Sequence, residues 1–317
     1  MKFVDKPFDL PYNGDNENRK RVVNKMSKIA IMTDSNSGIT QKKAAELGVS
    51  VLPMPFIIDG KEHYEGMDLT IKRFYEMQVG GADIVTSQPS QASVMEMWDE
   101  LLKEHDEVVH IPMTAALSES CNTAKLLARD YEGKVHVVDN ARISVSLRQS
   151  VLDAIELNKR GKSAVEIKKI LEADKFNASI YFMVDNMKYL KKGGRITPAA
   201  AMIGSVLNIK PVLTFQGGKI DRFAKPRGVA VAKAAIMDAI KKDIKTRFPN
   251  SAKPSKMNLV LIYSGGKSAI EVFQKEVEAA FPGFAMHTDP VSLSVATHTG
   301  PGIIALGCIP KMEYDNV

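Results

Sequence analysis

The stretch KIAIMTDSNSGIT, residues 28–40, decides the fold class of this chain. Its apolar first half, 28–32, is typical of a buried strand, and the polar corner that follows ends in Thr40, a residue suited to begin a helix. The same order of apolar strand, polar corner and amphipathic segment recurs along the first half of the sequence. This alternation predicts an α/β fold, with a mostly parallel sheet and helices on both of its faces.

The pattern gives the first unit several strands and helices. The predicted strands are 28–32, 51–58, 108–112 and 135–138. The predicted helices are 41–47, 69–77, 91–103, 118–129, 144–160 and 164–173. The polar segment ADKFNAS, 173–179, then interrupts the pattern, so we place a domain boundary there.

The second unit repeats the α/β pattern. Its predicted strands are 180–183, 210–215, 258–263, 284–286 and 303–306, and its predicted helices are 186–192, 199–207, 229–247 and 269–280. We therefore expect an extended or disordered leader at 1–27, an N-terminal α/β domain at 28–176 and a C-terminal α/β sandwich at 177–317. A ligand cleft between the two α/β units is the expected arrangement.

The composition is that of a globular protein, with 44% hydrophobic and 25% charged residues. The two cysteines, Cys121 and Cys308, provide neither a disulfide framework nor a metal cluster, so we expect a reduced, metal-free cytoplasmic protein. The sequence contains no apolar run of about 18 residues, which argues against a membrane span. Residues 1–25 lack the apolar centre of a signal peptide.

The positive charge is concentrated toward the C-terminus. Residues 181–317 contain 19 lysines and arginines against 10 aspartates and glutamates, and the chain as a whole has a formal net charge of +6. A basic half suggests an anionic partner, although a solvated helix face gives the same pattern. Aromatic residues do not alternate with these cations as they do in a nucleic-acid platform, so we expect no nucleic-acid partner.

Hydroxyl side chains occupy two strand-to-helix corners, each time just before a predicted helix. Thr86 and Ser87 occupy the first of these corners, and Thr114 and Ser118 occupy the second. Free backbone amides at a helix start, together with hydroxyl donors, can bind one anionic group. Neither corner has a lysine or a phosphate-binding glycine loop, so a carboxyl group fits better than a di- or triphosphate. Asp34, in the opening stretch, serves either as a turn and cap residue or as a ligand contact.

Two glycine-rich segments of the second unit carry the remaining candidates. Arg195 stands between a pair of glycines and a helix cap, and His298 precedes the turn Gly-Pro-Gly that leads into the last strand. We expect His298 at the lip of a sheet, where its imidazole can position an oxygen-rich group. Lys225 and Arg227 follow a predicted hairpin and are either solvated or functional.

Taken together, these segments resemble one family, the DegV-type fatty-acid-binding proteins of bacteria. They occur in family order over residues 28–308, and they are MTDSNSGIT, VLPMPFIIDGKEHYEG, TSQPS, LSESCNTA, VHVVDNARIS, YLKKGGRI, IGSVLNIKPVL, GGKI, KPR and HTGPG. The resemblance implies two α/β domains that bind one long-chain fatty acid non-covalently. It also implies a partner, an ATP-dependent fatty acid kinase, and a role as an acyl carrier that delivers acyl-phosphate for phospholipid synthesis. No cofactor is implied, and the carrier itself is not an enzyme.

The resemblance also implies roles for individual residues. Thr86, Ser87, Thr114 and Ser118 would hold the carboxyl group, with Arg195 and His298 near it. Lys225, Arg227 and His298 would meet the phosphorylated form or the kinase. The chain departs from the family pattern at TAALSES, 114–120, where Glu119 replaces an expected glycine and would repel an anion if it pointed inward.

A second interpretation makes the chain an enzyme in its own right. His298 and Arg195, together with Asp34, would then carry out acyl or phosphoryl transfer or hydrolysis. The sequence has no GxSxG nucleophile elbow and no phosphate loop, which disfavours this interpretation. A third interpretation, a nucleic-acid-binding regulator, rests only on the pI of about 9.0 and the basic C-terminal half.

Overall fold

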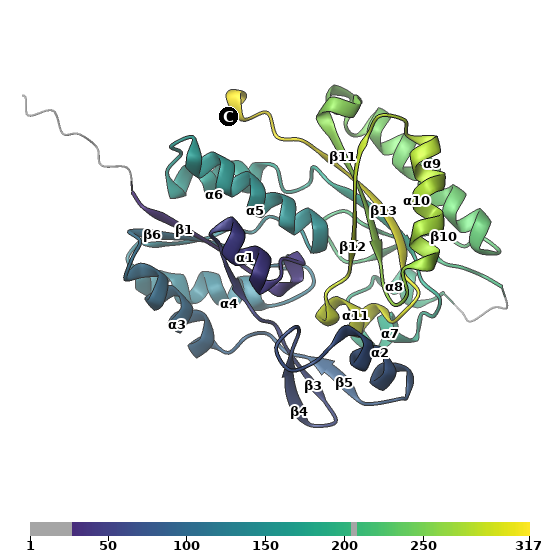
Figure 1. Cartoon of the computed structure of the whole chain (residues 1–317), viewed down its shortest axis with the longest axis horizontal. Coiled ribbons are helices and arrows are strands. Elements are labelled where there is room, and N and C mark those ends of the chain that lie inside the picture. The colour runs from purple at the N-terminus through teal and green to yellow at the C-terminus, as the bar shows by residue number, and fades with distance from the viewer. Residues whose placement is uncertain (1–26, 204–207) are drawn as a thin grey trace, which may run out of the picture.

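The structure, a computed structural model, describes residues 27–203 and 208–317 and contains three β-sheets with helices packed around them (Figure 1). The α/β fold class is therefore as predicted. Nearly all of the predicted leader, and the end of the predicted helix 199–207, lie outside the described residues.

The first sheet has four parallel strands in the order β2-β1-β6-β7. They are β1 (Ile29–Asp34), β2 (Ser50–Leu52), β6 (Glu107–Ile111) and β7 (Val135–Val137). Alternate residues of β1 enter different cores, since Ile29 and Ile31 pack in one cluster and Ala30 and Met32 in another. The helices that cover the two faces are α1 (Gln41–Leu47), α5 (Ser144–Lys159) and α6 (Ala164–Ala173) on one side, and α3 (Gln91–Leu102) and α4 (Ser120–Leu127) on the other.

The second sheet is mixed, with six strands in the order β10-β9-β8-β13-β11-β12. Only β11 and β12 pair in parallel; the other neighbours are antiparallel. The strands are β8 (Ser179–Met183), β9 (Val212–Phe215), β10 (Asp221–Ala224), β11 (Met257–Tyr263), β12 (Ala285–Pro290) and β13 (Ile304–Pro310). Two helices, α9 (Val229–Thr246) and α10 (Ser268–Ala280), cover one face, which leaves the other face of the sheet for the candidate site.

A third, antiparallel sheet of order β4-β3-β5 comes from the first half of the chain. It consists of β3 (Pro55–Ile58), β4 (Lys61–Tyr64) and β5 (Ile84–Thr86), together with the helix α2 (Ile71–Val79). The single strand predicted over 51–58 is therefore wrong: Pro53 separates β2 from β3, and the two strands belong to different sheets. Phe56 and Phe74 share a hydrophobic cluster with Phe182 and Val291 of the second unit, so residues 55–86 pack as part of that unit.

The C-terminal region contains three short helices, of which one was not predicted. They are α7 (Lys188–Gly193), α8 (Pro198–Ala201) and α11 (Leu293–Thr299). No helix was predicted before the last strand, but Ser292 caps α11, and its Oγ accepts a hydrogen bond from the amide of Val295. Helix α8 ends at Ala201, so it is shorter than predicted.

A buried arginine holds the chain where α6 leads into β8. The Arg142 side chain is almost fully enclosed, and its Nη2 donates to the Asp174 carboxylate at 2.6 Å and to the backbone carbonyls of Asp174 and Asn177. These contacts fix the segment in which we placed the domain boundary. The boundary at 176/177 itself stays a prediction.

We predict that Arg142→Ala lowers the free energy of unfolding by about 3–5 kcal/mol, because the substitution leaves a partly buried carboxylate and two carbonyls without their donor. Arg160→Ala is the matched control, since Arg160 pairs with Glu156 and Asp315 at the surface and should cost much less. Urea unfolding of both variants measures the difference. Equal losses would contradict the role given to Arg142.

Candidate functional site

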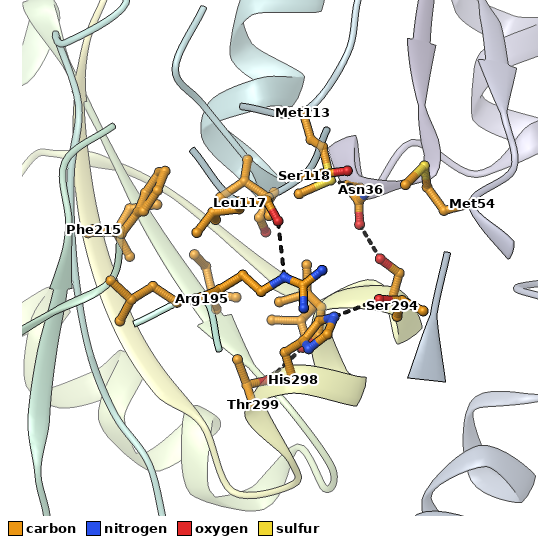
Figure 2. Close-up of a pocket in the computed structure, with 18 of the residues that line it drawn as sticks. Asn36, Met54, Met113, Leu117, Ser118, Arg195, Phe215, Ser294, His298 and Thr299 are labelled. Atoms are coloured by element: carbon orange, nitrogen blue, oxygen red, sulfur yellow. Dashed lines mark hydrogen bonds between the residues drawn. The ribbon is translucent and has the colours of Figure 1, made fainter. Parts of the chain in front are cut away.

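A cavity of about 450 Å³ lies between the four-stranded sheet unit and the face of the six-stranded sheet opposite α9 and α10 (Figure 2). This volume is within the range of small-molecule sites, about 300–1,000 Å³. Its lining comes from both units and from the 55–86 segment, and it includes Met54, Met113, Leu117, Phe215 and Val295. The cleft between two α/β units expected from the sequence is thus present.

The six-stranded sheet forms the apolar wall of the cavity. Ala305 of β13 lies between Ile262 of β11 and Phe182 of β8 in the strand register, and all three line the cavity. In the next row, Ile180 pairs with Phe215, and both also line it. Successive rows of apolar side chains on one sheet face make an extended surface that suits a hydrocarbon ligand.

His298 is positioned by a hydrogen bond to Thr86. The imidazole Nε2 lies 2.7 Å from the Thr86 hydroxyl, and both residues line the cavity. His298 precedes β13, as expected, but it lies in the last turn of α11 and not at the lip of a sheet. Burial, together with the positive charge of Arg195, lowers the pKa of His298 to about 4, so the imidazole is neutral at pH 7.

A neutral imidazole permits two proton arrangements at this contact. Nε2 can accept the proton of the Thr86 hydroxyl, or it can carry its own proton and donate to the hydroxyl oxygen. In the second arrangement, the hydroxyl proton of Thr86 is free to bond an oxygen atom in the cavity. The pair therefore provides a neutral donor that can adjust to a bound ligand.

Arg195 crosses from the second unit toward the first. Its Nε donates to the carbonyl of Leu117 at 3.2 Å (Figure 2). Its Nη1 donates to the carbonyl of Gly193. Within the part of the chain that the structure describes, Nη2 of Arg195 has no hydrogen-bond partner. The guanidinium group is thus held in place by two carbonyls and keeps one terminal nitrogen for a ligand.

The glycines that flank Arg195 and His298 in the sequence allow α7 and the end of α11 to pack closely together. A Cβ atom on Gly193 would stand 2.5 Å from Nδ1 of His298, and a Cβ on Gly300 would meet the ring of Tyr189 at 2.2 Å. A Cβ on Gly302 would likewise collide with the Asp185 carboxylate. The glycines before Arg195 and after His298 are therefore needed for the close packing of α7 against the end of α11.

The structure brings most of the predicted head-group residues together. Thr86, Ser87, Ser118, Arg195 and His298 line the cavity. Thr114 does not line it: the residue is 2% exposed, and its Oγ1 accepts from the amide of Ala116 and donates to the carbonyl of Gly217 at 3.5 Å.

Glu119, the departure from the family pattern, lies at the exposed edge of the cavity. Its carboxylate accepts a hydrogen bond from the side-chain amide of Asn122 at 2.9 Å. The carboxylate is therefore satisfied within its own helix start and is solvated, which reduces its repulsion of an anion in the cavity.

Lys225, Arg227 and Asp34 do not line the cavity. Lys225 and Arg227 are exposed on the segment between β10 and α9. Asp34 is buried, and its two carboxylate oxygens accept from the backbone amides of Asn36 and Met113 at 2.9 and 2.7 Å. Burial raises the pKa of Asp34 to about 6 despite these bonds. The grouping of His298, Arg195 and Asp34 that the enzyme interpretation needs is therefore not present.

Sequence reasoning missed Asn36 and Ser294, which line the cavity on the side of α11. The Asn36 Oδ1 accepts from the hydroxyls of Ser294 at 2.6 Å and Ser292 at 3.2 Å. The signal for Asn36 was its place in the polar corner after the first strand. Ser292 and Ser294 gave no signal, because α11 itself was not predicted.

In residues 27–203 and 208–317, no group of three or more histidine, cysteine, aspartate or glutamate side chains could hold a metal ion. Over the same residues, no helix has both the length and the apolar character needed to cross a membrane.

A family model described as an uncharacterised protein of the DegV family matches residues 28–311. The chain belongs to the DegV family. A DegV domain-containing protein of Deinococcus radiodurans is 30% identical over 283 residues, which cover 89% of this chain and 98% of that protein. A DegV domain-containing protein of Staphylococcus aureus is 26% identical and is covered over its whole length.

Solved DegV structures have the same fold. One described as fatty acid binding, from Thermus thermophilus, has a TM-score of 0.81 and 29% identity, and the match covers 89% of this chain and 99% of that one. DegV of Bacillus subtilis, described as a fatty acid binding protein, has a TM-score of 0.79 and 26% identity over 90% of this chain and 100% of its own. A stearic acid-binding protein of Eubacterium ventriosum has a TM-score of 0.78 and 25% identity, covering 91% of this DegV chain and 100% of its own.

We predict that Gly193→Ala raises the pKa of His298 above its wild-type value of about 4, because the new methyl group displaces the imidazole from its buried position. NMR titration of the histidine ring protons measures the shift. In the wild-type protein, this lowered pKa contributes stability that is lost as the pH falls from about 6.5 to about 4. Gly266→Ala is the control, since a Cβ there meets nothing within 4 Å. A His298 titration unchanged by Gly193→Ala would refute the interlocking of the two segments.

Proposed function

We propose that this DegV protein binds one long-chain fatty acid non-covalently in the cavity between its two α/β units. The observation that carries the proposal is the division of the cavity lining. The rows of apolar side chains on the six-stranded sheet suit a hydrocarbon tail, and the hydroxyl, imidazole and guanidinium groups opposite them suit a carboxyl group. The fatty acids named for the related structures support the same class of ligand.

The carboxyl group would lie among Thr86, Ser87, Ser118, Arg195 and His298. The hydroxyl groups supply neutral donors, and the free Nη2 of Arg195 supplies a charged one. Because His298 is neutral at pH 7, it contributes hydrogen bonding without a second positive charge. Thr114 would act on the carboxyl group only indirectly, because its hydrogen bonds hold the loop that carries Ser118.

The tail supplies most of the binding free energy. Removing a methylene group from water contributes about 0.8 kcal/mol, so the tail of a sixteen-carbon acid contributes on the order of 10 kcal/mol in an apolar cavity. Each neutral hydrogen bond to the carboxyl group adds about 1 kcal/mol. Tight retention therefore needs neither a covalent bond nor a cofactor.

We predict that denaturing extraction of the freshly purified protein, followed by mass spectrometry, recovers a long-chain fatty acid in stoichiometric amount. Thr86→Val should weaken binding of that acid by about three- to tenfold, since it removes one hydrogen bond while keeping the side-chain shape. Thr246→Val, at an exposed threonine of α9, is the matched control. A cavity that yields a nucleotide, or no lipid, would overturn the proposal.

We further propose that the bound acid is the substrate of a separate, ATP-dependent fatty acid kinase in the cytoplasm. The kinase would transfer the γ-phosphoryl group of ATP to a carboxylate oxygen and release ADP, and the protein would carry the acyl-phosphate toward phospholipid synthesis. The exposed cations Lys225 and Arg227 support this role, because they would meet an acidic surface or a phosphoryl group. His298 would contact the phosphorylated head group from inside the cavity.

We predict that the loaded protein, with ATP and a purified fatty acid kinase, forms acyl-phosphate that hydroxylamine traps as a hydroxamate. A double variant, Lys225→Ala with Arg227→Ala, should slow this formation several-fold while its fatty acid content stays at the wild-type level. The control omits the kinase. Hydroxamate formed by the protein and ATP alone would instead support the enzyme interpretation that uses His298 and Arg195.

A further inference from the structure

Helix α11 closes one side of the cavity and is anchored by side chains from outside its own segment. The Glu65 carboxylate accepts from the amide of Leu293 at 2.8 Å, and the Gln78 amide donates to the carbonyl of Ala296 at 2.9 Å. Thr86 bonds His298, as described above. The fourth anchor is Asn36, which accepts from the hydroxyls of Ser292 and Ser294.

These anchors come from two different parts of the structure. Glu65, Gln78 and Thr86 all come from residues 55–86, whose apolar side chains share a cluster with Leu293 and Ala296 of α11 itself. Asn36 instead follows β1 of the four-stranded sheet. Among the residues that the structure describes, Asn36 is the only one of that sheet unit with a side-chain hydrogen bond to α11 or its cap.

Asn36 is held rigidly enough to act as such a link. It is fully buried, its backbone amide donates to Asp34, and its side-chain Nδ2 donates to the sulfur of Met113 at 3.0 Å. The same Asp34 carboxylate accepts from the amide of Met113. The amide group of Asn36 therefore has a fixed orientation in which Oδ1 faces the two serines, as Figure 2 shows for Ser294.

We propose that Asn36 is a positioning residue that ties α11 to the four-stranded sheet unit and so sets the place of His298 in the cavity. This inference rests on the proposed function, because the cavity is the one to which we assign the fatty acid. Asn36 acts at the N-terminal end of α11, and His298 lies in its last turn, so loss of the Asn36 contacts lets the helix shift about its remaining anchors. The expected consequence is faster release of the fatty acid.

The test compares Asn36→Leu with Asn36→Asp in the full chain. Leucine has a similar shape but removes the acceptor, leaving two buried serine hydroxyls without it; aspartate keeps an accepting oxygen. With lipid removed, hydrogen exchange of the α11 backbone amides should be at least tenfold faster in Asn36→Leu and near the wild-type rate in Asn36→Asp. With lipid bound, Asn36→Leu should release it several-fold faster.

Asn258→Leu is the matched control, because the Asn258 amide also joins the two units, by a hydrogen bond to Gln149 at 3.3 Å, but does not touch α11. It should leave α11 exchange unchanged. If Asn36→Leu does not fold, Ser294→Ala removes the stronger serine contact from the other side and should accelerate α11 exchange in the same way.

The outcomes separate the two proposals. Unchanged α11 exchange in both Asn36→Leu and Ser294→Ala overturns the positioning role, even when fatty acid binds normally. Accelerated exchange that Asn36→Asp restores supports that role, even when the wild-type protein binds no fatty acid, in which case only the proposed function fails. Equal acceleration by Asn258→Leu would show a general loosening of the two units and would also overturn the inference.

Discussion

The site depends on the hydrogen bond between Thr86 and His298, which joins residues 212 positions apart in the sequence. Thr86 ends the last strand of the small sheet, and His298 lies in the last turn of α11, so this one contact fixes where two short elements meet. Neither element has a core of its own. Each is held by packing against the six-stranded sheet, and the imidazole stays neutral because that packing excludes water from it.

Much of the fold could be predicted from local pattern. The strands of the four-stranded sheet and the helices between them follow the alternation of apolar and amphipathic segments, and this is the signal that periodicity carries best. The polar corners after β5 and β6 were also predicted, because hydroxyl residues stand just before a helix in both places. Thr86 and Ser118 line the same cavity although β5 and β6 belong to different sheets, so the packing of the sheets against one another brings the two residues together.

The missed features depend on distant contacts. Helix α11 has the sequence LSVATHT, in which serine, valine and threonine are weak helix formers, so its stability comes from Glu65, Gln78 and Asn36 rather than from propensity. The switch of the chain from β2 to β3 at Pro53 was likewise hidden, because an apolar run does not say which sheet each half will join. The inward or outward direction of Glu119 depended on Asn122, one helical turn away.

The C-terminal segment after β13 returns to the first unit, where the Tyr314 hydroxyl donates to the Asp153 carboxylate of α5 at 2.8 Å. These residues are 161 positions apart, so at a ribosomal rate of 5–20 residues per second Asp153 emerges roughly 8–30 seconds before its partner. Residues 55–86 likewise precede the strands against which they pack. During translation, the nascent chain thus exposes apolar surface that only its later segments cover.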